Sequence, residues 1–381
     1  MKRMILFFVI IALTLTFINP AVSAQAEQTS VNARAAYVIE ASTGAVLYKY
    51  NPEAKYPIAS MAKIMTALIA FENIEKGNLS LDEQITVSES AAGMGGSQMF
   101  LEAGDTYTVD DLMKGIVVVS ANDASVQIAE RLAGSEEEFV NMMNERAKQL
   151  NMKNTHFNNC TGLPAPENYS SAEDVAIMTL ELIKHKDYYK YSTIWIENFN
   201  HPDGRVTEFV NTNKLVRFYK GCDGGKTGYT SESLFCLSAS AERNGMRVVS
   251  IIIGAPSSKI RFAECSRLLN TAFAQYKNEM VVDKDNFGVN EINVVCGKSD
   301  CAKVALDRSV YALVKKGDSV KYETTIEMSK SVKAPLKAGD KVGTLYVLDK
   351  GVVIEKRDII VTENIDKASY GDYLRKIFTQ W

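Results

Sequence analysis

Residues 224–254, GGKTGYTSESLFCLSASAERNGMRVVSIIIG, decide the fold of this chain. Three runs within the stretch are rich in β-branched and apolar residues, as strands are: 226–230, 234–240 and 246–254. Asn244-Gly245 lies between the last two runs and favours a tight hairpin turn, because both residues tolerate positive φ. The stretch therefore predicts three consecutive antiparallel strands.

The segments before and after this stretch complete the predicted sheet. Residues 35–41 and 45–50 predict a further hairpin around Ser42-Thr43-Gly44. Helices are expected where apolar residues recur at helical spacing beside capping or stop residues, namely at 60–76, after the Thr108/Asp111 capping box, at 123–132, at 135–150 and at 259–276. The pattern predicts an α+β fold over residues 30–280, with one five-stranded antiparallel sheet covered by helices.

The rest of the chain has a different character. From 281 to 365 short alternating strands are separated by glycine-containing turns, which predicts a small all-β sandwich domain. Residues 366–381 predict an amphipathic helix whose apolar face is Tyr370, Tyr373, Leu374, Ile377, Phe378 and Trp381. It is too short to span a bilayer, so we expect it to lie in the membrane interface. A helix docked on the protein, or a frayed end, is the alternative.

The N-terminal residues predict export. Lys2-Arg3 precedes an apolar run, and small residues lead up to Ala24, as in a secretory signal peptide spanning 1–24. An uncleaved N-terminal anchor is the alternative. We expect the mature protein to be extracytoplasmic and held peripherally at the outer face of the cytoplasmic membrane by its C-terminal helix.

Composition excludes several other classes of protein. The chain is 46% hydrophobic and 23% charged, with a formal net charge of -3, which does not indicate nucleic-acid binding. The cysteines lack zinc spacing and the three histidines do not cluster, so no metal and no cofactor are expected. Export permits disulfides, and both Cys222/Cys236 and Cys296/Cys301 flank short connections. Either pair is a candidate bridge, with free buried thiols as the alternative.

The first chemical motif is Ser60-Met61-Ala62-Lys63. Residues three apart share one face of a helix, so the Lys63 amine is expected to reach the Ser60 hydroxyl. A serine becomes nucleophilic when a neighbouring base takes its proton, and lysine is such a base once burial or a nearby positive charge favours its neutral form. Taken alone the spacing is weak, since a surface helix turn gives the same pattern.

The second motif is Ser120-Ala121-Asn122, which lies between two predicted helices. The Ser120 hydroxyl is suited to relaying a proton between Lys63 and a leaving amine, and the Asn122 amide to binding a substrate peptide. The competing interpretation is simple N-capping of the helix that begins at Asp123, because serine and asparagine are both preferred caps.

The third motif, Lys226-Thr227-Gly228, opens a predicted strand. Lys226 and Thr227 offer a positive charge and a hydroxyl donor to a carboxylate. Gly228 leaves room for a substrate backbone. The N–H groups of Ser60 and Tyr229 are candidates for an oxyanion hole. A turn followed by an edge strand is the alternative.

Together, and in this order, the three motifs resemble those of the penicillin-recognising acyl-serine enzymes. Within that group the chain is most similar to the low-molecular-weight D-alanyl-D-alanine carboxypeptidases over nearly its whole mature length. Further matching stretches are 56–60, 96–101, 104–105, 119–124, 161–163 and 343–344. The resemblance implies a transpeptidase/β-lactamase-like fold followed by a small β-sandwich.

The resemblance also implies roles. Ser60 is then the acyl-ester nucleophile, Lys63 the proton acceptor, Ser120 the proton relay and Lys226 the group that binds the substrate carboxylate. The implied reaction removes the terminal D-alanine of peptidoglycan stem peptides, and β-lactams are implied as covalent inhibitors.

Some positions depart from the family pattern. Relatives often carry histidine after Lys-Thr-Gly, where this chain has Tyr229, and some carry Asn-Arg-Asn where it has Asn211-Thr212-Asn213. Both differences bear on side-chain contacts with substrate. A peptidoglycan endopeptidase or transpeptidase is the nearest rival function. A β-lactamase is disfavoured because Glu167 is not followed by the Leu-Asn pair that positions its water, and a non-catalytic β-lactam sensor would not need both Lys63 and Ser120.

Overall fold

The computed structural model describes residues 30–318 and 321–379. The predicted signal peptide and Trp381 lie outside them. Within them the central sheet has five strands in the order β2-β1-β9-β8-β7, and all neighbours are antiparallel. The strands are β1 (Ala35–Glu40), β2 (Val46–Tyr50), β7 (Cys222–Thr230), β8 (Leu234–Arg243) and β9 (Met246–Ala255). The predicted α+β fold with a five-stranded sheet is confirmed.

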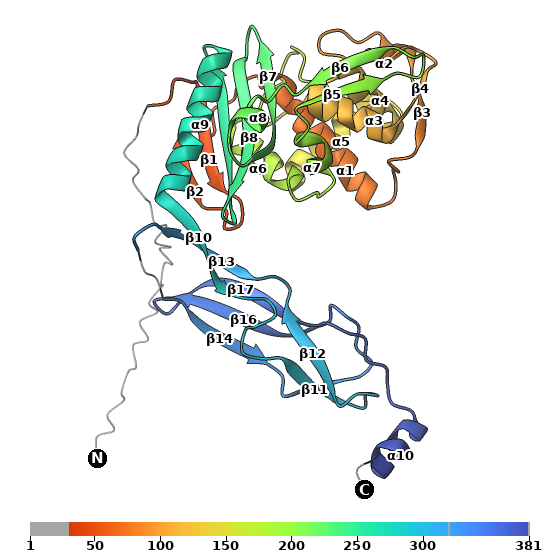
Figure 1. Ribbon diagram of the computed structural model, residues 1–381, viewed down its shortest axis with the longest axis vertical. Helices are drawn as coiled ribbons and strands as arrows, with labels where there is room; N and C mark the ends of the chain where they lie inside the picture. The colour runs from red at the N-terminus through yellow and green to blue at the C-terminus, as the bar shows by residue number, and fades with distance from the viewer. Residues whose placement is uncertain (1–29, 319–320, 380–381) are drawn as a thin grey trace, which may run out of the picture. The chain divides into compact units, whose positions relative to one another are not determined.

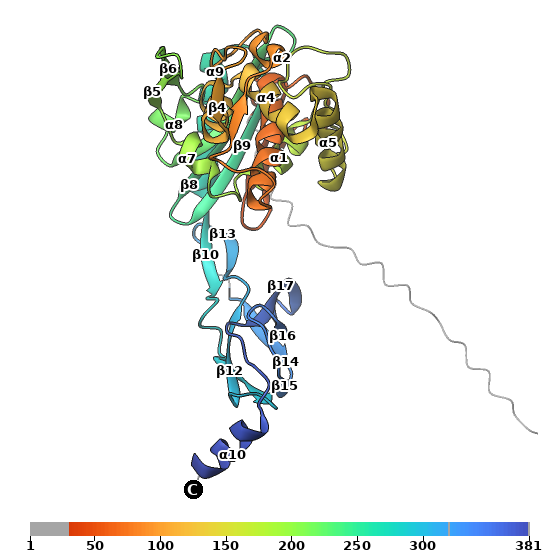
Figure 2. The ribbon, with the colours of Figure 1, turned by 90° about the vertical axis from the view of Figure 1, so that its right-hand side faces the viewer.

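Helices cover both faces of this sheet (Figure 1). The larger layer contains α1 (Lys63–Glu75), α2 (Glu89–Ala92), α3 (Val109–Lys114), α4 (Asn122–Ala133), α5 (Glu136–Gln149), α6 (Ala172–Leu182) and α7 (Tyr188–Ser192). The other face is covered by α8 (Leu215–Phe218) and α9 (Ser258–Gln275). In the view of Figure 2, α1 and α4 lie between β9 and α5.

The two layers explain why the inner strands are apolar throughout rather than alternating. Along β1, Tyr37 and Ile39 point into the core beneath the larger helical layer, whereas Ala36 and Val38 point into the core beneath α9. Strand β9 behaves in the same way. A strand that is buried on both faces has no solvent side on which polar residues would be favoured.

Two small hairpins flank the larger helical layer. Strand β3 (Gln84–Thr86) pairs with β4 (Thr106–Thr108), and β5 (Ile196–Asn200) pairs with β6 (Val206–Val210). They were not anticipated from the sequence, because strands of three to five residues carry too little periodicity to recognise.

The C-terminal part is all-β, as predicted. Strands β10 (Tyr276–Val282) and β13 (Val310–Lys315) form a two-stranded sheet. A six-stranded sheet has the order β14-β16-β17-β12-β11-β15, formed by β11 (Glu291–Val295), β12 (Cys301–Leu306), β14 (Glu323–Met328), β15 (Ser331–Lys333), β16 (Lys341–Asp349) and β17 (Val352–Val361). Both sheets contribute to one apolar core. The helix α10 (Tyr370–Thr379) follows.

All six cysteines are free in the structure. The register of the β7–β8 pair explains why the first candidate bridge does not form, since Cys222 lies opposite Ala241 whereas Cys236 lies opposite Gly228. The two thiols are therefore separated along the hairpin, and flanking a turn was not a sufficient criterion.

Candidate active site

The side-chain amine of Lys63 contacts the side-chain hydroxyl of Ser60. Its Nζ donates hydrogen bonds to Oγ of Ser60 at 3.2 Å, to Oδ1 of Asn122 at 2.6 Å and to the carbonyl oxygen of Thr161 at 2.7 Å. An ammonium group has three protons. The three acceptors therefore fix the Lys63 amine in one place, next to the serine hydroxyl.

Burial controls the charge of Lys63. The residue is 1% exposed, and removal from water lowers its pKa to about 7, although Cys160 and Asp123 act in the opposite direction. None of its three hydrogen-bond acceptors is a carboxylate. A lysine in this setting has a substantial neutral fraction near neutral pH and is able to accept a proton from a hydroxyl.

Ser60 lies in a 3₁₀ turn, Ala59–Ala62, and α1 begins only at Lys63. The helix predicted from residue 60 therefore starts one turn later. The backbone around this turn is closely packed. Ala59 has φ +48°, and the backbones of Gly162 and Gly228 lie directly against the turn. A Cβ on Gly162 would lie 1.9 Å from the Ala59 carbonyl oxygen, and one on Gly228 would lie 2.5 Å from that of Ile58.

Ser120 occupies a strained position between a π turn, Gly115–Val119, and α4. Its φ and ψ are +66° and +34°, in the left-handed region that serine rarely adopts. The residue is buried, and among the described residues its hydroxyl has no hydrogen-bond partner. Backbone strain of this kind persists only where the surrounding structure imposes it.

Asn122 and Ser120 do not cap α4. The N-cap position is Ala121 and no side chain caps it, so the capping interpretation is wrong. Instead the Asn122 amide accepts from Lys63 and donates to the carbonyl oxygen of Gly95 at 2.7 Å. The adjacent Asp123 accepts hydrogen bonds at 3.1 Å from the N–H groups of Met99 and Leu101. The start of α4 thereby fixes the loop at residues 95–101 beside the site.

Lys226 lies on β7, the edge strand of the sheet. It is 5% exposed, and burial, with Lys63 and then Arg261 nearby, lowers its pKa well below its ordinary range. Arg261 comes from α9 and is also buried; Nη1 donates to the Gly228 carbonyl at 3.1 Å. None of the three basic side chains, Lys63, Lys226 and Arg261, has a carboxylate among its described hydrogen-bond partners. An anionic ligand would stabilise their protonated forms, so this region is suited to bind one.

The remaining predicted residues lie along the same strand. Thr227 is buried, and a Cβ added to Gly228 would lie 3.2 Å from the Ser60 nitrogen. Tyr229 is 57% exposed, and its ring centroid lies 4.4 Å from that of Phe235. Sequence reasoning missed the parts played by Thr161, Asp123 and Arg261. Thr161 contributes a backbone carbonyl, and Asp123 and Arg261 bind backbone groups distant in sequence, so no local pattern marks them.

Comparison with known proteins gives consistent matches over both parts of the chain. Residues 21–257 match the D-alanyl-D-alanine carboxypeptidase family Peptidase_S11, and residues 276–367 match the C-terminal domain of penicillin-binding protein 5. The D-alanyl-D-alanine carboxypeptidase DacF of Bacillus subtilis is 38% identical over 386 residues, covering 100% of this chain and 99% of the relative. DacC of Escherichia coli is 32% identical, covering 93% and 92%.

Solved structures agree. Penicillin-binding protein 5 from Haemophilus influenzae has a TM-score of 0.69 at 29% identity, covering 89% of this chain and 98% of that one. A peptidoglycan synthesis regulatory factor (PBP3) from Streptococcus pneumoniae has a TM-score of 0.72 at 26% identity, covering 88% and 100%.

Proposed function

The chain belongs to the D-alanyl-D-alanine carboxypeptidase family, and from this premise we propose that Ser60 is the nucleophile that carries the acyl group of the cleaved stem peptide. The protein is a serine-type D-alanyl-D-alanine carboxypeptidase. The observation that carries the proposed assignment is the 3.2 Å contact between Nζ of Lys63 and Oγ of Ser60, together with the burial that favours the neutral amine.

In the proposed acylation step, neutral Lys63 takes the Ser60 proton as Oγ attacks the carbonyl carbon of the penultimate D-alanine. The carbonyl oxygen becomes an oxyanion, which the N–H groups of Ser60 and Tyr229 stabilise. The proton passes through the Ser120 hydroxyl to the leaving amine, the C–N bond breaks, and D-alanine departs. Water then attacks the ester carbonyl carbon while one of its protons passes to Lys63. The acyl C–Oγ bond breaks and Lys63 returns that proton to Oγ, which regenerates Ser60.

Substrate binding is proposed to use the third motif and the interhelical loop. Lys226 and Thr227 bind the terminal carboxylate, Gly228 admits the substrate backbone, and Asn122 binds a substrate amide. Within the described residues Lys226 has no carboxylate partner, which supports this assignment, since a bound carboxylate would stabilise the protonated amine and form a charge-assisted contact with it.

The pH dependence of acylation tests the role of Lys63. The active form is the neutral amine, so the acylation rate should rise with pH through about 7 and reach a plateau above it. A lysine with the ordinary pKa of 10.5 would keep rising toward that value instead. The measurement is the second-order rate of labelling by fluorescent penicillin from about pH 5 to about pH 9. A flat profile, or one still climbing at the upper end, would contradict a Lys63 base with a pKa of about 7.

We also propose the domain division and the location of the protein. Residues 1–24 act as a signal peptide, 30–280 form the catalytic domain, 281–365 the β-domain, and 366–381 hold the protein at the outer face of the cytoplasmic membrane. No helix within the described residues is long and apolar enough to cross a bilayer. The support for interfacial binding is the exposure of apolar side chains on α10: Tyr370 at 80%, Tyr373 at 43% and Leu374 at 39%.

Deleting residues 369–381 should therefore release the protein from lipid without changing its chemistry. Co-sedimentation of the mature chain with vesicles of phosphatidylglycerol and phosphatidylethanolamine should fall by about tenfold or more, because a short interfacial helix supplies most of the apolar contact. Release of D-alanine from a soluble peptide serves as the control and should be unchanged. Equal sedimentation of both forms would favour a helix docked on the protein.

A further inference from the structure

The strand that carries Lys226 begins with a kink. The pairing of β7 with β8 shifts its register between Cys222 and Gly224. Gly225 has φ +121°, and a Cβ there would lie 2.1 Å from the carbonyl oxygen of Ser238. Only glycine fits this conformation. The peptide unit immediately before Lys226 is therefore set by the kink rather than by regular strand geometry.

Side chains bind the backbone of this kinked segment. Oγ of Ser192 donates to the Asp223 carbonyl at 2.6 Å, Nδ2 of Asn213 donates to the Gly224 carbonyl at 3.0 Å, and the Gly225 N–H donates to Oη of Tyr188 at 2.8 Å. β7 is an edge strand, so no neighbouring strand supplies these partners.

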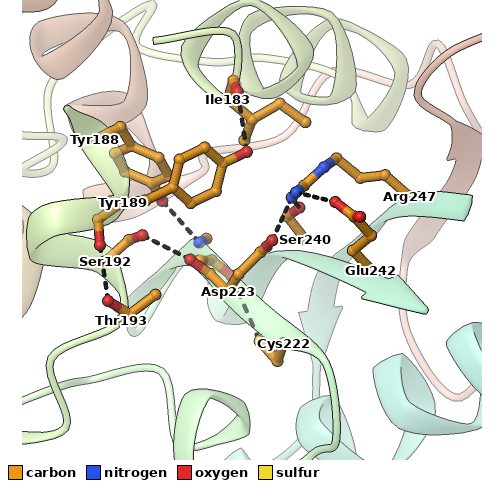
Figure 3. A network of polar contacts seen from close by, with 12 residues as sticks. Ile183, Tyr188, Tyr189, Ser192, Thr193, Cys222, Asp223, Ser240, Glu242 and Arg247 are labelled. Atoms are coloured by element: carbon orange, nitrogen blue, oxygen red, sulfur yellow. Dashed lines mark hydrogen bonds and ion pairs between the residues drawn. The ribbon is translucent and has the colours of Figure 1, made fainter. Parts of the chain in front are cut away.

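Figure 3 shows that Tyr188 and Ser192 reach β7 from the same short helix, α7, and that Arg247 pairs with Asp223 beside them. Tyr188 is the largest of the buried side chains that hold the kink. It is 2% exposed, and its ring packs edge-on against Phe71. A Cβ on Gly224 would lie 2.8 Å from its hydroxyl oxygen. Tyr188 also lines a cavity of about 10 Å³ together with Lys63, Gly225 and Lys226, so it lies close to both lysines.

The position of the Lys226 amine depends on this backbone. In the described part of the chain, its one hydrogen bond is to the Thr227 carbonyl at 3.3 Å, and no acidic side chain pairs with it. A lysine without an anchor at its tip is directed mainly by the placement of its own Cα and by the packing of its stem. A rotation of the preceding peptide would therefore move the ammonium group.

We propose that Tyr188 is a positioning residue for the carboxylate subsite, holding the Gly225 N–H so that Lys226 meets the terminal carboxylate of the substrate. The inference rests on the proposed role of Lys226. Without the Tyr188 oxygen, a buried N–H loses its acceptor, and the kink is free to relax toward another partner. Loss of this hydrogen bond should weaken recognition of the substrate carboxylate. Ser60 and Lys63 should keep their positions, because separate contacts hold them.

The test compares acylation by a fluorescent penicillin with acylation by its methyl ester, which lacks the carboxylate. In Tyr188→Phe, the second-order rate with the free acid should fall about tenfold, the effect of one lost hydrogen bond. The rate with the ester should change less than about twofold, so the preference for the acid shrinks. Tyr191→Phe is the matched control, because this buried tyrosine lies on the same helix but donates to Asp110 at 2.6 Å. It should keep the preference.

The outcomes separate the hypotheses. An equal loss with acid and ester would mean that the hydroxyl acts only on general stability, and an unchanged preference would mean that it does not position Lys226. Either result overturns the proposal for Tyr188 while leaving Ser60 in place. If the unmodified protein itself showed no preference for the acid, the assigned role of Lys226 would fail as well. Melting temperatures of both variants show whether each is folded.

Discussion

Ser60→Ala should abolish covalent labelling by penicillin and lower D-alanine release by at least about four orders of magnitude. In the proposed mechanism the acyl group bonds to the hydroxyl oxygen of Ser60, and among the described residues of the site the other serine, Ser120, is held in a left-handed turn on a different element. The measurements are gel fluorescence after penicillin labelling and the assay of free D-alanine from diacetyl-Lys-D-Ala-D-Ala.

The same substitution should leave the fold almost unchanged. Oγ of Ser60 accepts one hydrogen bond, from Lys63, and the side chain is partly exposed. Ser135→Ala is the control, because Ser135 caps α5 by accepting from the Glu138 N–H at 3.1 Å. It should lose about 1 kcal/mol of unfolding free energy and keep full labelling. Labelling that survived in Ser60→Ala would refute the nucleophile and revive a non-covalent binding role.

The fold was largely predictable because its signals are local. The Asn244-Gly245 turn has φ +53° and +74° as a tight hairpin requires. The capping box at Thr108 and Asp111 is present with both of its hydrogen bonds. In each case a few neighbouring residues contain all the information, so reading the sequence in short windows succeeds.

The site was predictable only where chemistry resides in side chains at fixed spacing. Ser60 and Lys63 are such a pair. The third acceptor of Lys63 is a carbonyl oxygen 98 residues away at Thr161, and every residue has a carbonyl, so the sequence contains no sign of it. The left-handed turn at Ser120 was hidden for a similar reason, since tertiary packing imposes a conformation that serine does not prefer.

The glycine next to Ser60 shows most clearly that tertiary packing, and not local sequence, determines the geometry of the site. Gly162 has φ +80°, and a Cβ on it would lie 1.9 Å from the Ala59 carbonyl oxygen and 2.9 Å from the Ser60 nitrogen. These distances are far inside van der Waals contact, and the opposing atoms belong to backbone that cannot rotate away. Gly162→Ala must therefore displace the turn that presents Ser60 and its N–H.

We expect Gly162→Ala to reduce the second-order rate of penicillin acylation by about 100-fold to 1,000-fold, comparable to the loss of one oxyanion donor. Gly134→Ala separates this effect from backbone strain. Gly134 has φ +84°, nearly the same conformation, but a Cβ there would meet nothing within 4 Å. Each variant should lose about 1–2 kcal/mol of stability from placing alanine in the left-handed region. Only Gly162→Ala bears the additional collision with the catalytic turn.

The two alanine variants can be compared directly, because Gly162 and Gly134 have nearly the same φ but differ in whether atoms lie close to the added Cβ. If acylation by the two alanine variants agreed within about threefold, the contact between Gly162 and Ala59 would not position the nucleophile. If Gly162→Ala acylated slowly while melting cooperatively, the loss would lie in the geometry of the site rather than in unfolding. Residues 161 and 162 would then serve the reaction entirely through their backbone, one by accepting from Lys63 and the other by leaving room for Ser60.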